Sequence, residues 1–120
     1  MAALASRGAT VLATLTNDVW YGETDAPWQH LRAVRFRAAE NHRTILRAAL
    51  TGVSAWVEPD GRLSSTLGVG DEGTLRGELT PRDELTLFTR LPWATPIACL
   101  LICLVVLPSA ILAGRRSRDV

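Results

Sequence analysis

The fold is organised around the stretch Thr16-Asn17-Asp18-Val19-Trp20-Tyr21-Gly22, which joins a short apolar run, residues 10–15, to a turn-rich stretch, residues 23–27. The apolar run is rich in β-branched residues and predicts a buried strand over residues 9–15. The quoted stretch then forms a loop that carries an amide, a carboxylate and two aromatic rings. Because ligand sites in α/β layers collect where strands end in loops, we expect a pocket here.

A helix over residues 27–42 is expected directly after this loop. Either Thr24 or Asp25 can cap its first turn, where Pro27 is tolerated. Four apolar residues fall on one stripe of the helix, which predicts the face that packs against a sheet: Leu31, Val34, Ala38 and Ala39.

Strands are expected on the C-terminal side of the helix. Residues 44–50 form a strand-like run that Arg47 interrupts, and residues 53–57 form a second run. Glu58-Pro59-Asp60-Gly61 follows, and the chain returns over residues 62–67. Proline sets φ for a turn and glycine accepts a positive φ, so this pattern predicts a hairpin. The elements together predict an α/β fold.

The next segment combines a glycine-rich loop, residues 68–73, with a further strand candidate, residues 74–79. Three glycines could indicate a loop that cradles a phosphate. No helix is expected after them and two acidic residues lie among them, so the pattern argues against that reading.

The composition limits the classes of function. A chain of 120 residues provides one small domain. Its formal net charge is +1, which implies no attraction to nucleic acid. All 13 basic residues other than histidine are arginines, and both cysteines, Cys99 and Cys103, lie in the apolar C-terminal run. The remainder therefore contains no disulfide and no thiolate metal site, and no cofactor is expected.

Residues 91–113 carry no charge and predict a transmembrane helix, since at 1.5 Å per residue they would reach about 34 Å. Trp93 at one end and Arg115 and Arg116 at the other are expected to anchor it. The positive-inside bias places the C-terminus in the cytoplasm and residues 1–90 outside. A buried helix of a soluble protein is the alternative, but so small a chain could not cover it on all sides.

The candidate site residues are Asn17, Asp18 and Trp20, for which a simple turn is the alternative, because Asn and Asp often bond their own backbone. His30 lies close enough to the loop to reach a substrate. His30 and His42 would be about 18 Å apart on a continuous helix, so they cannot share a metal ion, and no acid is spaced to assist either of them.

Two of these segments, residues 15–22 and 26–31, resemble the late part of the apolipoprotein N-acyltransferase family, membrane-embedded enzymes of the nitrilase (carbon–nitrogen hydrolase) superfamily. Residues 35–43 resemble the family's Arg-x-Arg-Ala-x-Glu helix, and residues 46–55 resemble the strand that follows it. Val19 and Tyr21 stand where Ala and Phe are commoner.

This resemblance implies a partial nitrilase-like α-β-β-α sandwich over residues 1–84, a linker over 85–90, the transmembrane helix over 91–113 and a basic tail over 114–120. It also implies that the loop over residues 16–22 lines the acyl-binding site. The expected wall of that pocket comprises Asn17, Asp18, Trp20, Tyr21 and His30.

The family reaction transfers an acyl chain from a phospholipid to the N-terminal cysteine of a lipoprotein through a Cys thioester, using a Glu-Lys-Cys triad. This sequence has no lysine at all, and it has no cysteine outside residues 91–113. We therefore expect a C-terminal fragment of such an enzyme, located in the cell membrane, lacking its N-terminal half and inactive alone. The alternative is a membrane-anchored, non-catalytic module that acts with a partner chain.

Overall fold

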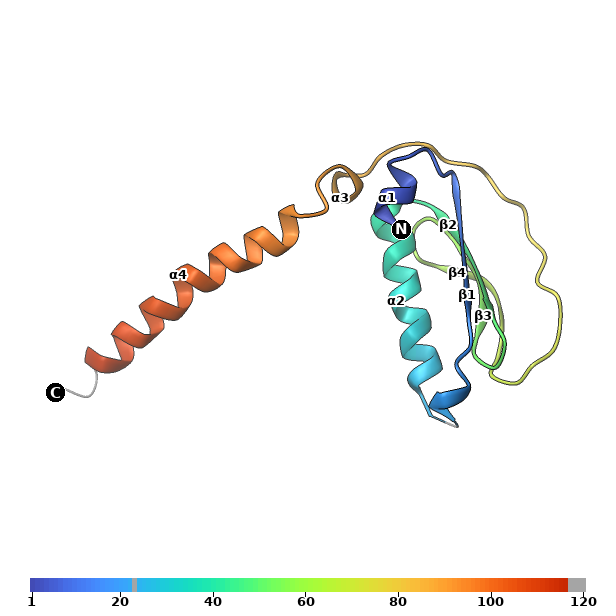
Figure 1. The fold of residues 1–120 in the computed structure, drawn as a ribbon, viewed down its shortest axis with the longest axis horizontal. Coiled ribbons are helices and arrows are strands. Elements are labelled where there is room, and N and C mark those ends of the chain that lie inside the picture. Colours follow the sequence, from blue (N-terminus) through green and yellow to red (C-terminus); the bar gives the residue numbers. More distant parts are fainter. Residues whose placement is uncertain (23, 117–120) are drawn as a thin grey trace. The chain divides into compact units, whose positions relative to one another are not determined.

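The computed structural model describes the backbone of residues 1–22 and 24–116, with all their side chains except those of Thr95 and residues 108–116. The chain divides into two compact units, residues 1–90 and residues 91–120. In the first unit a four-stranded sheet carries helices on one of its faces (Figure 1).

The sheet combines one parallel and two antiparallel strand pairs. Its strands lie in the order β1 (Val11–Thr16), β2 (Thr44–Ala49), β3 (Ser54–Val57) and β4 (Leu63–Leu67). β1 and β2 are parallel, and helix α2 (Ala26–Asn41) provides the crossover between them. β2 with β3, and β3 with β4, are antiparallel. The predicted α/β class is therefore confirmed.

The predicted hairpin turn connects β3 to β4. The Glu58 N–H donates to the Arg62 carbonyl at 2.8 Å, and the Gly61 N–H donates to the Glu58 carbonyl at 2.8 Å. Gly61 has a φ of 82°, which a residue with a side chain rarely adopts. Arg35 of α2 donates its Nε–H to the Gly61 carbonyl at 2.7 Å, so the turn is fastened to the helix.

Helix α2 covers one face of the sheet. Its buried residues Leu31, Val34 and Ala38 belong to the predicted apolar stripe, whereas Ala39 is exposed. They pack against residues from three strands and the loop before β3, which form the core of the unit: Leu12, Ile45, Val53, Ala55 and Val57. Burying a side chain of this kind contributes about 1.5–3 kcal/mol, so this layer provides most of the stability of the fold.

The two ends of α2 are closed in different ways. At the N-terminus, the Thr24 hydroxyl accepts a hydrogen bond from the Ala26 N–H at 3.3 Å, whereas the Asp25 side chain makes no capping bond. At the C-terminus, His42 adopts the left-handed conformation with φ 50°, where glycine is the usual residue. The helix thus ends one residue before the expected position.

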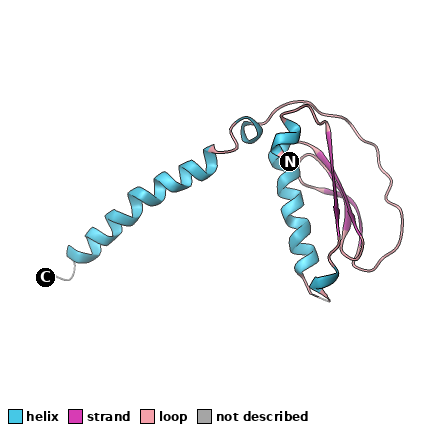
Figure 2. Cartoon of the chain, in the orientation of Figure 1, coloured by secondary structure: helices cyan, strands magenta, loops and turns pink. Residues whose placement is uncertain are grey.

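A stretch without helix or strand, residues 68–86, passes along the side of the sheet opposite α2 and ends beside the C-terminal end of α2 (Figure 2). The prediction of a strand over residues 74–79 is wrong. Gly77 packs on the ring of Trp56, and a Cβ atom added at Gly77 would lie 3.1 Å from that ring. The stretch therefore crosses a sheet face instead of following a sheet edge, where an edge strand would offer it a ladder of hydrogen bonds.

The buried residue Arg43 fastens this stretch to the end of α2. Its Nε–H donates to the Ala9 carbonyl at 2.8 Å, and its Nη1 donates to the Glu84 carbonyl at 2.8 Å. The Thr86 hydroxyl donates to the Glu40 carbonyl, and Thr89 donates to Asn41 Oδ1 at 3.3 Å. Arg43 thus joins segments far apart in sequence. Two further α-helices of this unit, α1 (Ala2–Ala5) and α3 (Leu87–Arg90), are short.

The second unit contains helix α4 (Ala94–Arg116). Trp93 precedes it and is 74% exposed, and the described apolar side chains from Ile97 to Leu107 are also exposed. Within the described part of the chain, no helix combines the length and the apolar character that crossing a membrane requires. The side chains of Arg115 and Arg116, the predicted cytoplasmic anchors, lie outside the described residues.

Candidate functional site

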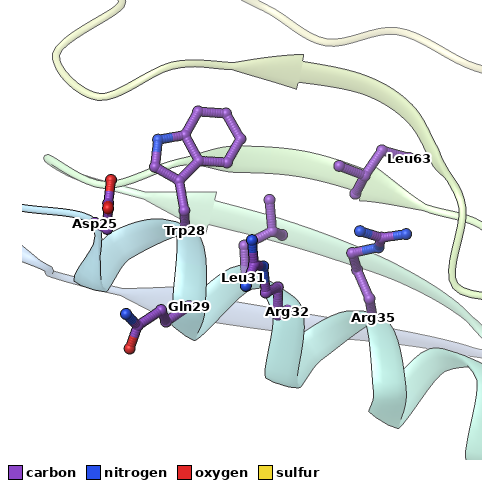
Figure 3. Close-up of a pocket in the computed structure, with 7 residues that line it drawn as sticks. All are labelled: Asp25, Trp28, Gln29, Leu31, Arg32, Arg35 and Leu63. Atoms are coloured by element: carbon purple, nitrogen blue, oxygen red, sulfur yellow. The ribbon is translucent and has the colours of Figure 1, made fainter.

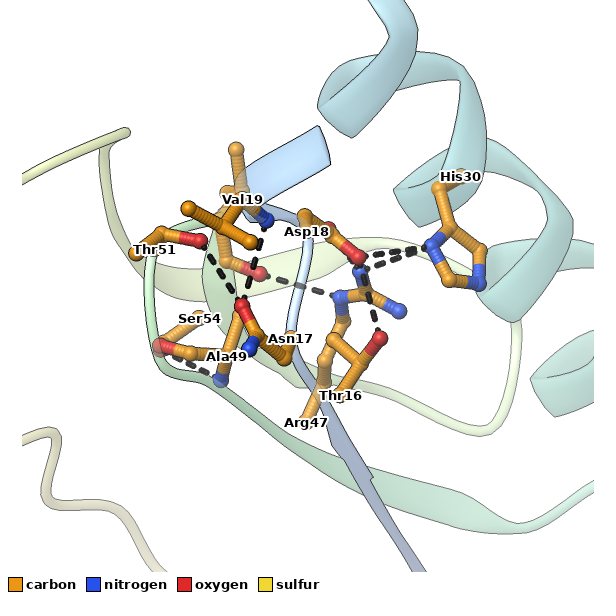
Figure 4. Close-up of polar contacts among 10 residues, drawn as sticks. Thr16, Asn17, Asp18, Val19, His30, Arg47, Ala49, Thr51 and Ser54 are labelled. Carbon is orange, nitrogen blue, oxygen red and sulfur yellow. Dashed lines mark hydrogen bonds and ion pairs between the residues drawn. The ribbon is translucent and has the colours of Figure 1, made fainter. Parts of the chain in front are cut away.

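Two loops meet at the carboxyl ends of the parallel strands β1 and β2. The first leads from β1 into the short helix η1 (Val19–Tyr21), and the second, residues 50–53, leads from β2 to β3. The Leu50 N–H donates to the Thr16 carbonyl at 3.0 Å, and the Thr51 hydroxyl donates to Asn17 Oδ1 at 3.2 Å. These bonds hold the predicted loop against a second loop (Figure 4).

A buried ion pair lies beneath the loops. Arg47 Nη2 donates to Asp18 Oδ2 at 2.7 Å, and the two side chains are 0% and 1% exposed. The Nε–H of Arg47 also donates to the Val53 carbonyl at 3.0 Å. The prediction that Arg47 interrupts its strand is therefore wrong: β2 continues through this residue because Asp18 compensates its buried charge.

The Asp18 carboxylate accepts bonds through both of its oxygens. Its Oδ1 accepts from the Thr16 hydroxyl at 2.9 Å and lies 3.1 Å from His30 Nδ1. Gly52 makes room for it, since a Cβ atom added at Gly52 would lie 2.2 Å from Asp18 Oδ2. Asp18 thus connects β1, β2 and α2, and the site requires glycine at position 52 for steric reasons.

His30 is joined to the site from α2. The expectation that no acid assists it is wrong, because Asp18 contacts it across the crossover. Its ring also packs edge-on against Tyr21, with 6.3 Å between ring centroids. The side chain is 39% exposed, so the imidazole lies between the buried ion pair and solvent.

Asn17 and Trp20 lie on the outer side of the loop. The Val19 N–H donates to Asn17 Oδ1 at 3.1 Å, which is the turn expected of an Asn at this position. The same oxygen accepts from Thr51, so the amide orientation is fixed by two donors. Trp20 is 72% exposed, and its ring lies edge-on to Tyr21 with 6.3 Å between centroids.

A surface pocket of about 370 Å³ lies elsewhere, between α2 and Leu63 of β4 (Figure 3). Its lining comes mainly from the first turns of α2: Asp25, Trp28, Gln29, Leu31, Arg32, Arg35 and Leu63. None of the five predicted wall residues lines this pocket. This pocket could not be predicted from the sequence, because its walls combine residues from the first turns of α2 with Leu63 of a distant strand.

The site around Asp18 offers a carboxylate, a guanidinium and an imidazole. Arg47 Nη1 is buried without a hydrogen-bond partner among the described residues, where most buried polar atoms have one. The described part of the chain also contains no cluster of side chains that could hold a metal ion. These groups can orient a ligand or accept a proton, but a covalent nucleophile is not among them.

Comparison with known proteins supports a functional assignment. A family model described as carbon-nitrogen hydrolase matches residues 1–84. Apolipoprotein N-acyltransferase from Pseudomonas putida is 37% identical over 120 residues, covering 99% of this chain and 23% of the relative. The proteins of the same name from Pseudomonas syringae pv. tomato and Ralstonia nicotianae are 38% and 45% identical, over 96% and 72% of this chain. The chain spans 22% and 16% of these two relatives.

Proposed function

Because this chain belongs to the carbon–nitrogen hydrolase family, we propose that it forms part of an N-acyltransferase that modifies lipoproteins. The acyl donor would be a phospholipid, and the acceptor would be the N-terminal, diacylglyceryl-modified cysteine of a lipoprotein. The observation that carries this proposal is the 37% identity to an apolipoprotein N-acyltransferase over 99% of the chain.

Within this function, the loop after β1 would form one wall of the acyl-binding site. Its proposed residues are Asn17, Asp18, Trp20, Tyr21 and His30. The His30 ring contacts both Asp18 and Tyr21, and the hydrogen bonds of Asn17 hold the same loop in place. Trp20 offers an exposed apolar ring that suits an acyl chain.

The β1 and β2 part of the sheet face opposite α2 supports a second layer of structure. Side chains alternate along a strand, so Ala13 and Leu15 of β1 and Leu46 and Ala48 of β2 point away from α2. Leu15 is 85% exposed. A second sheet packed on this apolar face would complete the α-β-β-α sandwich.

A membrane location is the third part of the proposal. The uncharged run over residues 91–113 would cross the cell membrane, with residues 1–90 outside and the C-terminus in the cytoplasm. The described apolar side chains of α4 are exposed around the helix, which suits contact with lipid. Trp93 would lie at one interface, and Arg115 and Arg116 at the other.

The reacting groups of the proposed enzyme must come from outside these 120 residues. The sequence contains no lysine, and Cys99 and Cys103 lie in α4, so the Glu-Lys-Cys triad cannot be assembled from these 120 residues. The missing groups would lie either in the same polypeptide or in a partner chain.

Thioester formation with a labelled phospholipid tests this proposal. The purified chain alone should form no labelled thioester, and the assembled enzyme that supplies the Glu, Lys and Cys should form one. Loss of that thioester when residues 1–90 are removed from the assembled enzyme is expected. A thioester on Cys99 or Cys103 of the isolated chain would overturn the proposal.

A further inference from the structure

The imidazole of His30 presents one free nitrogen at the edge of the site. Nδ1 lies 3.1 Å from Asp18 Oδ1, and the described residues supply no hydrogen-bond partner for Nε2. The ring is 39% exposed. In Figure 4 its second nitrogen points away from Asp18 and Arg47.

Asp18 determines which nitrogen of the neutral ring carries the proton. An ionised carboxylate only accepts hydrogen bonds, so the contact at 3.1 Å favours a proton on Nδ1. Arg47 Nη2 lies 3.2 Å from the same Nδ1 and carries a second N–H beside the one that it donates to Asp18 Oδ2 at 2.7 Å, so this contact alone would favour an unprotonated Nδ1. The contact with Asp18 is the shorter of the two at Nδ1, and we take it to decide the tautomer. The opposite tautomer would place two lone pairs against each other at Nδ1 and Oδ1. With the proton on Nδ1, Nε2 is an acceptor that is held in one orientation.

The chemistry of the proposed substrates then selects the ligand. The ester carbonyl and the phosphate of a phospholipid present only acceptor oxygens toward the protein, which cannot bond an acceptor nitrogen. The lipoprotein, which receives the acyl chain, instead carries an α-ammonium group, and this group donates hydrogen bonds. A carboxylate-held imidazole with a free Nε2 is also the arrangement that general-base catalysis uses.

We propose that His30 is a catalytic residue that binds the α-ammonium of the acceptor cysteine through Nε2 and removes one proton from it. This inference rests on the proposed function. The freed amine attacks the thioester carbonyl carbon, a C–N bond forms and the C–S bond breaks. The second N–H proton passes to the departing thiolate, which regenerates the thiol, and His30 returns its proton to solvent.

Asp18 is then a positioning residue that acts through His30. Its buried pairing with Arg47 and the close approach of Gly52 leave the carboxylate no freedom to turn away. An Asp18→Asn substitution can present an N–H to Nδ1, which would move the ring proton to Nε2 and remove the acceptor.

The two half-reactions separate this inference from the proposed function. In the assembled enzyme, His30→Gln should form the thioester at the normal rate but transfer the acyl chain to a diacylglyceryl-cysteine peptide about 10²–10⁴-fold more slowly. Hydroxylamine is unprotonated at neutral pH and needs no base, so it should discharge the thioester of His30→Gln as fast as that of the native enzyme.

The matched control is His42→Asn, which removes the other histidine from a similarly half-buried position and suits its left-handed backbone. This variant should carry out both half-reactions normally. Asp18→Asn should reproduce the selective loss of transfer and show the His30 proton on Nε2 by NMR. Normal transfer by His30→Gln, or an equal loss with hydroxylamine, would overturn the inference. Absence of the thioester in the native enzyme would instead refute the proposed function.

Discussion

The first unit contains two carboxylate–imidazole pairs of nearly equal length and very different surroundings. Asp18 lies 3.1 Å from His30 with its carboxylate 1% exposed, whereas Glu84 lies 3.2 Å from His42 with its carboxylate 67% exposed. Asp18 has a buried arginine at 2.7 Å, whereas the arginine that the described residues place beside Glu84 is Arg82, at 3.8 Å. The difference shows that burial and a second partner, rather than the length of the contact, decide which pair holds a ring in place.

The largest effect is expected from breaking the buried pair. Arg47→Met should lower the free energy of unfolding by about 3–5 kcal/mol, because Asp18 would be left as an uncompensated buried charge. Urea denaturation followed by tryptophan fluorescence measures this. Arg82→Met makes the same change beside Glu84 and is the control, with a loss below about 1 kcal/mol. Equal losses in the two variants would contradict the comparison.

A smaller effect is expected from crowding the same carboxylate. Gly52→Ala would place its Cβ atom 2.2 Å from Asp18 Oδ2, so Asp18 or the loop must shift. We expect a loss of about 1–3 kcal/mol in the free energy of unfolding. The NMR signals of Asp18 and His30 should shift as well. Unchanged stability together with unchanged signals would show that Gly52 does not constrain Asp18.

The exposed pair of Glu84 and His42 should contribute little to the free energy of unfolding. Glu84→Gln removes the charge beside His42, and double-mutant cycles for exposed pairs give about 0.2–1 kcal/mol. The loss in the free energy of unfolding caused by Glu84→Gln should disappear in high salt, because the carboxylate faces solvent. A double-mutant cycle of Glu84→Gln with His42→Asn measures the coupling. A coupling energy above that range at high salt would contradict the comparison, because the Glu84–His42 pair would then be as strong as the buried Asp18–His30 pair.

The smallest effect concerns a third contact, between Asp60 and Arg62 at the hairpin turn. The Arg62 backbone N–H, followed by its side chain, lowers the pKa of Asp60 below its ordinary value of 3.8. A lowered carboxyl pKa stabilises the folded state above the ordinary pKa, and this contribution is lost as the pH falls through the folded pKa. The Arg62 amide signal should therefore change only below about pH 4. A midpoint above 3.8 would contradict this account.

The local features of the fold could be predicted from the sequence. The helix over Ala26–Asn41 follows from a stripe of period 3.6, and the hairpin follows from proline and glycine at turn positions. Both depend on residues close together in the chain. The same reasoning located the loop after β1 and selected its candidate residues.

The contacts that build the site could not be predicted in this way. Arg47 and Asp18 are 29 residues apart, and His30 reaches Asp18 only after α2 crosses over the sheet. From the sequence alone, an arginine within an apolar run indicates that the strand is interrupted there, because the buried partner of the arginine is not known. Gly52 and Gly77 are required because a carboxylate and an indole approach them, which the sequence around each glycine does not reveal.

The central claim is that Asp18 holds His30 with its proton on Nδ1 and a free acceptor at Nε2. A long-range ¹H–¹⁵N correlation spectrum of the chain at a pH where both histidines are neutral tests it directly, with His42 as the internal comparison. We expect the His30 Nδ1 to show the shift of a protonated nitrogen and Nε2 that of an unprotonated one, and this pattern should reverse in Asp18→Asn. A proton on Nε2 of His30 in the native chain would contradict the claim.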